Sequence, residues 1–386
     1  MARGRTIATT FVAGLLVAVL ATPGPAAASG ERQRVFGTVD LSFHSRVEPV
    51  EAARMARGGV RALRYSFDWF GVEATEGTYR WGKLDRVVGN LSSHGVRSLP
   101  VLFGTPHWAV PGLPPDPFGS GASGAVALNV PSGDDTAYPP VLTAPARAGW
   151  SRFVAAAVTR YGPGGSYWSD VYPRTHPGAT PLPIHTWQIW NEPNIAGAFW
   201  PVPRVRRYGR LVKISARAIR AADPAAKIAL AGLPGRVAYR GVRFIERLYR
   251  RVPHIARYFD IVAFHPYAPT VTGAVDQLFH LRRALRRHHH GRVPLWVSEI
   301  GWGSARRDRH FNAGPRGQAR MLTHLFKALR RDRGRLRLRR VSWFDWRDPR
   351  RNDPNCPWCA RAGLINWHGE RKPAWNAYRA FVRGPR

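Results

Sequence analysis

Two glutamates stand at the ends of short apolar runs, where a carboxylate can act as an acid, a base or a nucleophile. Glu192 lies in the run WQIWNEPN at 187–194, and Glu299 lies in the run WVSEIGW at 296–302. A buried carboxylate is costly unless it is paired or used. Either glutamate alone could be a strand-end residue paired with one of the many arginines. Two such carboxylates among aromatic residues match the requirements for cleaving a glycosidic bond.

The surrounding pattern predicts the elements that must position these carboxylates. Apolar runs alternate with amphipathic runs, which is typical of a parallel sheet with helical crossovers. Strands are expected at Val35–Leu41, Val60–Ser66, Val96–Phe103, His185–Trp190, Lys227–Ala231, Ile261–His265, Leu295–Ser298 and Val341–Trp346. Helices are expected at Pro49–Arg57, Trp81–His94, Ala146–Arg160, Val205–Ala222, Arg240–Arg251, Ala274–His288, Gly317–Arg331 and Ala374–Phe381. Eight strands and eight helices predict an α/β fold, a closed (β/α)8 TIM barrel.

Two segments interrupt the alternation. Pro106–Pro145 is rich in Pro, Gly and Ser and follows the third strand, so it is expected as a long loop at the barrel end that carries active sites. Gly162–Pro183 precedes the fourth strand and is expected at the opposite end. We assign no function to this second segment.

The first 28 residues have the order of a secretory signal. Arg3 and Arg5 precede an apolar run, and small residues end at Ala28, where cleavage is expected. The run is too short for a comfortable membrane span, so an uncleaved anchor is the less favoured alternative. Residues 31–386 are expected to form one catalytic domain. The protein is therefore predicted to be secreted, without a membrane span after cleavage.

The formal net charge is +35, and nearly all of it comes from arginine. Such a field can attract anionic polymers of a cell envelope at low salt. Nucleic-acid binding is not favoured, because the arginines are spread along predicted helices without a reader motif. A solvated basic exterior is the preferred interpretation.

Cys356 and Cys359 are the only cysteines and are spaced CPWC. In an exported chain with Pro and Asn before them, a local disulfide that braces a loop is favoured over redox chemistry. No second pair of ligands accompanies them, so zinc is not expected. We predict no metal, no cofactor and a monomeric protein.

The two glutamate motifs resemble those of clan A of the glycoside hydrolases, the retaining (β/α)8 enzymes. The flanking sequence resembles families 5 and 39 of that clan, including cellulase-like, xylosidase-like and exopolysaccharide-cleaving members. The matching pieces are Leu63-Arg64, Thr105-Pro106-His107-Trp108, Asp223-Pro224-Ala225-Ala226, His265-Pro266-Tyr267 and Trp343-Phe344-Asp345-Trp346. The resemblance covers essentially the whole mature chain.

The resemblance implies a role for each matching residue. Glu192 would be the acid/base and Glu299 the nucleophile. Asn191 would bind the sugar 2-hydroxyl, and Arg64 would keep Glu299 ionised. Tyr267 would orient Glu299. The remaining expected substrate contacts are His107 and His265, which would bind hydroxyls, and Trp108, Trp302 and Trp346, which would stack on sugar faces.

These features predict a retaining hydrolase of poly- or oligosaccharides. A transglycosylase that uses the same residues is an alternative, and so is a catalytically silent binder of an anionic glycan or cell-wall polymer. The sequence does not identify the sugar or its linkage. It does not separate endo from exo action, because that depends on the shape of the loop at 106–145.

Overall fold

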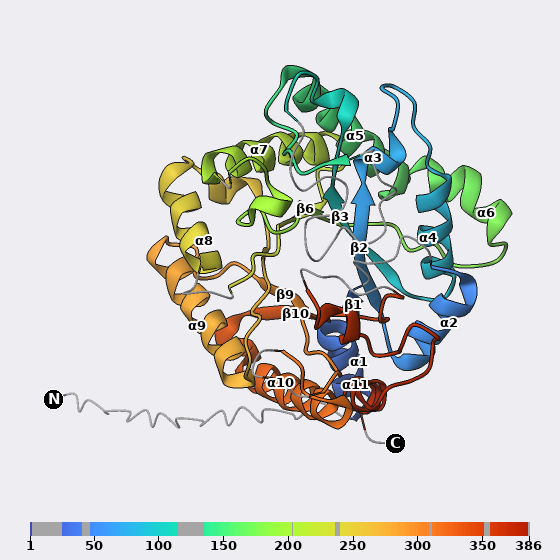
Figure 1. Cartoon of the computed structure of the whole chain (residues 1–386), viewed down its shortest axis with the longest axis vertical. Helices are drawn as coiled ribbons and strands as arrows, with labels where there is room; N and C mark the ends of the chain where they lie inside the picture. Colours follow the sequence, from blue (N-terminus) through green and yellow to red (C-terminus); the bar gives the residue numbers. More distant parts are fainter. Residues whose placement is uncertain are drawn as a thin grey trace.

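The computed structural model describes Met1, Asp308 and residues 25–40, 47–114, 135–202, 204–235, 240–306, 311–350 and 356–384. Eight parallel strands form the central sheet, in the order β7-β6-β3-β2-β1-β10-β9-β8. A parallel bridge between Ala229 and Ile261 joins the two ends of this order. The sheet is therefore a closed barrel, and a ring of helices surrounds it (Figure 1). This confirms the predicted TIM barrel.

The barrel strands are β1 (Thr38–Asp40), β2 (Ala62–Asp68), β3 (Arg97–Phe103), β6 (Thr186–Ile189), β7 (Lys227–Leu230), β8 (Val262–Phe264), β9 (Leu295–Ile300) and β10 (Leu338–Trp343). A small antiparallel pair, β4 (Thr105–Pro106) with β5 (Asp135–Thr136), follows β3. The strands overlap the predicted ranges. The largest boundary differences are at the first strand, which begins three residues later than predicted, and at β10, which begins and ends three residues earlier than the predicted Val341–Trp346.

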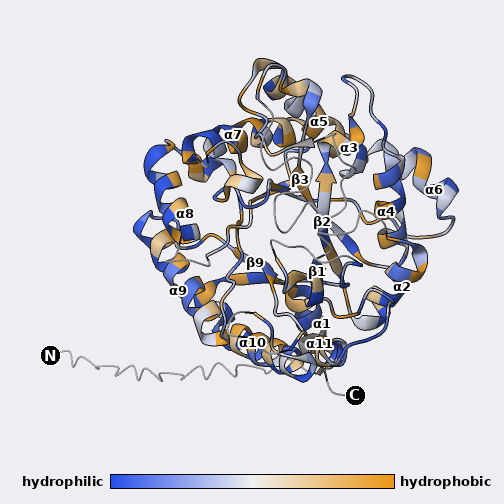
Figure 2. Ribbon diagram, viewed as in Figure 1, coloured by the Kyte–Doolittle hydropathy of each residue, from blue (hydrophilic) through white to orange (hydrophobic). Residues whose placement is uncertain are grey.

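The helices are α1 (Pro25–Phe36), α2 (Pro49–Gly58), α3 (Trp69–Val72), α4 (Gly82–Ser93), α5 (Ala144–Tyr161), α6 (Tyr172–Thr175), α7 (Val205–Ala222), α8 (Arg240–Arg251), α9 (Val271–Arg287), α10 (Pro315–Leu336) and α11 (Pro373–Arg383). Their inner faces are hydrophobic and their outer faces hydrophilic, as Figure 2 shows. Burial of these apolar faces against the sheet is the main stabilising term. No helix in the described part of the chain is long and apolar enough to span a membrane.

The predicted strand Val35–Leu41 is wrong at its beginning. Val35 and Phe36 belong to the end of α1, where Phe36 packs against Phe326 and Phe381. Gly37 then ends the helix, and a Cβ there would lie 2.3 Å from the carbonyl oxygen of Gln33. The apolar pair therefore makes a helix–helix contact, while Leu41 lies outside the described residues.

The two segments that were predicted to be irregular, 106–145 and 162–183, both contain short regular elements in their described parts. Residues 115–134 of the predicted loop lie outside the described residues. Its described start contains β4 and the short 3₁₀ helix η1 (His107–Ala109). The segment at 162–183 contains η3 (Tyr167–Val171) and α6, which the sequence did not predict. The predicted signal segment lies mostly outside the described residues, and the expected cleavage point after Ala28 falls within α1.

Candidate active site

The two glutamates come together at the carboxyl ends of the barrel strands. Glu192 follows β6 and Glu299 lies near the end of β9. One carboxylate oxygen of each, together with one nitrogen of His265, forms a group whose members all lie within 4.8 Å of one another. Glu299 is fully buried and Glu192 is 8% exposed. Glu192 is therefore the carboxylate that a molecule can reach from outside.

Backbone conformation contributes to the placement of Glu192. Trp190 and Glu192 have positive φ angles of 69° and 47°, respectively. Such angles are uncommon outside glycine and cost free energy unless the surrounding structure imposes them. The N–H of Glu192 donates to the carbonyl of Gly232, and the Trp190 ring is fully buried with its Nε1 donating to Ala198. These contacts hold the carboxylate in its position after β6.

Arg64 of β2 connects four side chains in the floor of the site. Its Nη1 donates to Asp40 at 2.5 Å and to Glu299 at 2.6 Å. Its Nε and Nη2 donate to Gln188 and Asn191, both at 2.8 Å. Burial opposes its charge, but Asp40 and Glu299 outweigh burial and raise the pKa of Arg64. The guanidinium is therefore a fixed positive charge beside Glu299, as predicted.

Glu299 has a second donor in Tyr267. The Tyr267 hydroxyl donates to Oε2 of Glu299 at 2.8 Å, which is the predicted contact. Burial, reinforced by Glu299 and Glu192, raises the pKa of Tyr267 well above its ordinary value, so the hydroxyl keeps its proton. Burial also raises the pKa of the Glu299 carboxyl to about 7, against the lowering effects of His265 and Arg64. The expectation that Arg64 keeps Glu299 ionised omitted this desolvation.

His265 makes a different contact from the predicted one. Its Nδ1 lies 2.8 Å from Glu192 Oε1 and 3.4 Å from Glu299 Oε2. Its Nε2 is pressed against Gly232, where an added Cβ would lie only 1.8 Å away. Burial lowers the pKa of His265 to about 4, so the ring is neutral near pH 7. We therefore correct the hydroxyl-binding role: His265 is buried and holds the two carboxylates.

Asn191 retains a donor that has no partner in the described part of the chain. Its Oδ1 accepts from Arg64, whereas its buried Nδ2 makes no hydrogen bond there. A buried amide donor is normally satisfied. The arrangement leaves Nδ2 available to a hydroxyl beside Glu192 and Glu299, and the contact with a sugar stays a prediction.

Two further carboxylates, Asp40 and Asp345, were missed by the sequence analysis. Asp40 ends β1 and binds Arg64. Asp345 follows β10, accepts from the Trp346 N–H at 2.5 Å and leaves its buried Oδ2 without a partner in the described residues. Burial, then the nearby Asp40, raises the pKa of Asp345 well above its ordinary value. The rule that found Glu192 and Glu299, a carboxylate at a buried strand end, would also have found both aspartates.

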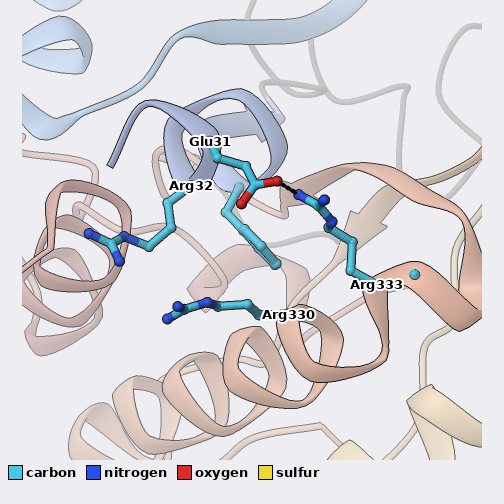
Figure 3. Close-up of a pocket in the computed structure, with 6 residues that line it drawn as sticks. Glu31, Arg32, Arg330 and Arg333 are labelled. Carbon is cyan, nitrogen blue, oxygen red and sulfur yellow. Dashed lines mark hydrogen bonds and ion pairs between the residues drawn. The ribbon is translucent and has the colours of Figure 1, made fainter. Parts of the chain in front are cut away.

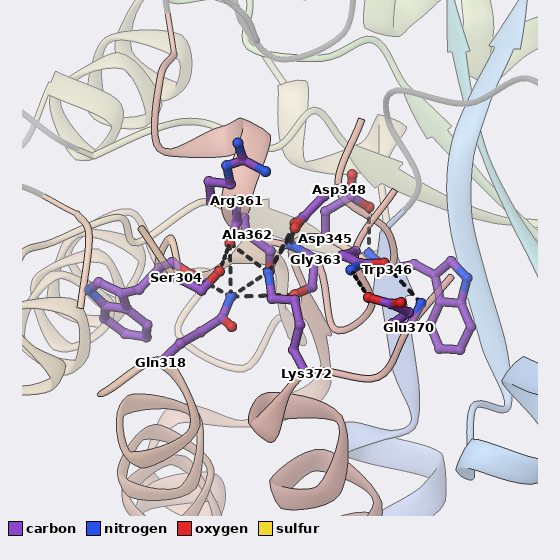
Figure 4. Close-up of polar contacts among 12 residues, drawn as sticks. Ser304, Gln318, Asp345, Trp346, Asp348, Arg361, Ala362, Gly363, Glu370 and Lys372 are labelled. Carbon is purple, nitrogen blue, oxygen red and sulfur yellow. Dashed lines mark hydrogen bonds and ion pairs between the residues drawn. The ribbon is translucent and has the colours of Figure 1, made fainter. Parts of the chain in front are cut away.

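The loops behind Glu299 and Asp345 are joined by buried polar contacts (Figure 4). Gln318 of α10 donates to the carbonyls of Trp302 at 2.8 Å and Ala362 at 3.0 Å. Asp348 accepts from Lys372 and from the Gly363 N–H. These bonds tie α10 to the loops after β9 and β10 and join the segments around Asp348, Gly363 and Lys372.

The predicted aromatic stacking residues are corrected in two places. Trp302 is buried, and its Nε1 donates to the carbonyl of Ala268. Trp346 is fully buried against Trp375, with its Nε1 bonded to Glu51. Neither ring presents a face to a sugar, because strand-end tryptophans at these positions complete the packing between strands and helices.

His107 and Trp108, which follow β3 and were predicted to contact the substrate, differ in burial. Trp108 is half-buried, packs edge-on against Trp69 at 5.4 Å and donates to the carbonyl of Glu73. His107 is exposed at the start of η1. Substrate contact by either residue stays a prediction.

The cysteines form the predicted local disulfide, and it brackets a tryptophan that the sequence analysis did not single out. Cys356 and Cys359 are bonded. Trp358 between them packs against Tyr267, with ring centroids 5.2 Å apart. The disulfide loop therefore lies directly behind the tyrosine that binds Glu299.

The donor group of Glu192, His265 and Glu299 is also compact enough to hold a metal ion. The expected absence of a metal therefore stays a prediction.

The fold is shared with known glycoside hydrolases. No protein-family model matches the chain, and no curated protein sequence matches it. The structure matches a family 39 glycoside hydrolase from Bacteroides cellulosilyticus with TM-score 0.64 and 18% identity, over 92% of this chain and 64% of that one. It matches a monomeric β-xylosidase from Caulobacter crescentus with TM-score 0.61 and 19% identity, over 90% of this chain and 67% of that one.

A xylanase B from Clostridium stercorarium matches with TM-score 0.54 and 15% identity, over 92% of this chain and 99% of that one. The chain spans less than two thirds of the Bacteroides enzyme, so a further part of that protein has no counterpart here. At these identities the likeness shows the fold. It confirms the resemblance to family 39 and related clan A enzymes at that level.

Proposed function

We propose that this chain is a retaining O-glycoside hydrolase that cleaves a poly- or oligosaccharide by double displacement. The observation that carries the proposal is the approach of Glu192 and Glu299, with one oxygen of each within 4.8 Å. Retaining enzymes hold their carboxyls about 5–5.5 Å apart, whereas inverting enzymes need about 6.5–9.5 Å to admit a water molecule.

In the first step Glu299 attacks the anomeric carbon as Glu192 gives its proton to the leaving oxygen, and the glycosidic bond breaks. In the second step Glu192 removes a proton from water, the water oxygen attacks the same carbon and the Glu299 ester bond breaks. Arg64 and Tyr267 stabilise the negative charge on Glu299 when it leaves. Asn191 Nδ2 donates to the 2-hydroxyl beside the reacting carbon.

The assignment of Glu299 as nucleophile and Glu192 as acid/base follows from the exposure and the contacts of each carboxylate. Glu299 has two strong donors in Arg64 and Tyr267, which suit a carboxylate that must form and release an ester. Glu192 is the more exposed carboxylate, so it can exchange protons with a leaving group and with water. The neutral His265 ring bonds Glu192 without adding a positive charge that would drive off its proton.

The proposal is tested by assaying the purified protein on 4-nitrophenyl glycosides and on plant and bacterial polysaccharides. Proton NMR of the first product gives its anomeric configuration. We expect retention, unchanged activity after EDTA treatment, and hydrolysis in the absence of an added acceptor. Inversion, or activity that is lost with EDTA and restored by a divalent metal, would contradict the mechanism. Product formation only with an added sugar acceptor would identify a transglycosylase.

We also propose that the protein is exported, because residues 1–28 have the order of a secretory signal. N-terminal sequencing of the protein from culture medium is expected to give a chain that starts at Ser29. Recovery of the full chain only from the cell interior would contradict export.

A further inference from the structure

A pocket of about 480 Å³ lies at the amino ends of the strands, opposite the carboxylate cluster. We define the basal arginine pocket by its eight lining residues: Glu31, Arg34, Val35, Arg61, Arg97, Arg333, Arg339 and Arg340. Arg61 precedes β2, Arg97 begins β3, and Arg339 and Arg340 lie near the start of β10. The pocket is therefore lined by residues at the starts of three strands and at the ends of α1 and α10.

The charges in this pocket do not balance. Six guanidinium groups face one carboxylate, and that carboxylate, Glu31, is paired with Arg333. The side chains of Arg34, Arg97 and Arg339 make no hydrogen bond or ion pair with any residue that the structure describes. Like charges that share a concave site repel one another unless an anion enters it.

Arg340 gives an independent indication that a partner is missing. Its Nη1 donates to Thr38 at 3.0 Å and its guanidinium lies over the Trp296 ring, 5.0 Å from the centroid. Its Nε is buried and has no hydrogen-bond partner among the described residues. Burial, then the nearby Arg97, lowers the pKa of Arg340 to about 10. Buried donors of this kind are normally satisfied.

An adjoining pocket extends the basic surface along α1 and α10. It shares Glu31 and Arg333 with the first pocket and adds Arg32 and Arg330 (Figure 3). In Figure 3 the only ion pair drawn is between Glu31 and Arg333. Arg32 also leaves its buried Nε without a partner in the described part of the chain.

Stabilisation of cations at helix C-termini explains the position of only some of these arginines. Arg34 and Arg333 lie in the last turns of α1 and α10, where a cation is stabilised by the helix dipole. Arg61, Arg97, Arg339 and Arg340 belong to strand starts, which have no comparable dipole. Their convergence needs another source of negative charge.

We propose that the basal arginine pocket binds an anion that carries two or more adjacent phosphate groups. Guanidinium forks match phosphate oxygens in paired hydrogen bonds. A tetrahedral phosphate can accept from several directions at once, which suits arginines that converge from different strands, whereas a carboxylate offers two oxygens in one plane. More than one phosphate suits the pocket because five guanidinium charges remain after Glu31 is paired, and although Arg61 donates to Gln33 and to backbone carbonyls, these neutral acceptors leave its charge uncompensated.

This site does not depend on the proposed glycosidase activity. It lies at the other end of the barrel, so occupation of the pocket does not obstruct Glu192 or Glu299. The phosphates could belong to a free di- or triphosphate or to a phosphate-bearing polymer, and the chemistry recognised is the same.

Isothermal titration calorimetry with sodium tripolyphosphate at physiological salt tests the proposal. The test variant is Arg34→Gln/Arg97→Gln/Arg339→Gln, because these three side chains are exposed and bond to no described residue. The matched control is Arg206→Gln/Arg210→Gln/Arg217→Gln on the outer face of α7, which removes the same charge. Melting temperatures of all three proteins verify folding.

We expect one tripolyphosphate per chain and weakening by about tenfold or more in the test variant, since each guanidinium–phosphate bond is charge-assisted. The control is expected to bind within about twofold of the parent, because distant surface charges are screened. Equal loss in both variants, or no saturable binding of either tripolyphosphate or long-chain polyphosphate, would overturn the proposal. Competition between tripolyphosphate and long-chain polyphosphate for one site gives their relative affinities. Tighter binding of tripolyphosphate indicates a free source, and tighter binding of the long chain indicates a polymeric one.

Discussion

The two ends of the barrel treat charge in opposite ways. At the carboxyl ends of the strands, Arg64 is surrounded by Asp40, Glu299, Gln188 and Asn191, so its donors are satisfied by the chain itself. At the amino ends, six arginines share one glutamate. The first region is organised in advance for a reaction. The second is electrostatically incomplete and gains most from a ligand.

The largest expected effect is at Glu299. Glu299→Gln removes the proposed nucleophile, and we expect kcat to fall by roughly 10⁴-fold or more. The protein should remain folded, because the substitution removes one charge from a crowded group of carboxylates. Activity is measured on the best substrate of the panel, with Glu76→Gln, an exposed glutamate, as the control. Near-full activity in Glu299→Gln would contradict the assigned role.

The next effect is at Glu192, the proposed acid/base. Glu192→Gln is expected to lower kcat/KM by about 10²–10⁴-fold on substrates with poor leaving groups. Aryl glycosides with good leaving groups need less protonation and should lose less in the first step. Kinetics on a series of leaving groups measures this difference. An equal loss across the series would contradict acid catalysis by Glu192.

The pH profile tests the electrostatics at the catalytic end. Only ionised Glu299 can attack, and its pKa is raised to about 7, so kcat/KM is expected to fall as the pH drops below about 7. Tyr267→Phe removes a hydrogen bond to the charged carboxylate, which raises that pKa further and moves the acid limb to higher pH.

Measurement of kcat/KM from pH 4 to 10 for both proteins checks this sign. At pH 7 we expect roughly tenfold lower activity in Tyr267→Phe, with recovery at higher pH. Tyr378→Phe is the control, because that buried hydroxyl has no partner in the described residues. A uniform loss at every pH would indicate a merely structural role for Tyr267.

A smaller effect is expected from the disulfide loop. Reduction of Cys356–Cys359 releases Trp358, which packs against Tyr267. Loss of such an aromatic contact is worth at most roughly 0.5–1.5 kcal/mol, so activity should fall by no more than about tenfold. Assays with and without reductant, repeated on Cys356→Ser/Cys359→Ser, measure it. Complete inactivation of the double variant without unfolding would show that the loop does more than support Tyr267.

The smallest effect on hydrolysis is expected from the basal arginine pocket. Arg34→Gln/Arg97→Gln/Arg339→Gln should change kcat/KM on neutral substrates by less than about twofold, because screening removes the influence of these charges on Glu192 and Glu299 at the other end of the barrel. A large loss of activity with an unchanged melting temperature would mean that the two ends are coupled.

Periodicity and strand-end signals predicted most of this molecule. The alternation of apolar and amphipathic runs gave all eight strands of the barrel, and Glu192 and Glu299 converge as expected. Val35 and Phe36 were misassigned because an apolar pair serves a helix contact as well as a strand. Periodicity alone cannot separate the two when Gly37 allows either.

Side-chain direction was the part that the sequence could not supply. Trp302 and Trp346 stand at strand ends like true stacking residues, but their indole N–H groups find acceptors inside the protein. His265 lies beside Tyr267 in sequence, yet it bonds Glu192 while Tyr267 bonds Glu299. The burial that raises the pKa of Glu299 also depends on three-dimensional packing, which no local motif encodes.

The most direct test of the central claim is covalent trapping of the nucleophile. A 2-deoxy-2-fluoro glycoside of the preferred sugar, with a good leaving group, slows hydrolysis of the glycosyl ester and lets it accumulate. Peptide mass spectrometry of the trapped protein is predicted to place one sugar on Glu299, and Glu299→Gln should take up none. A sugar attached to another residue, or an active enzyme that forms no ester, would contradict the account.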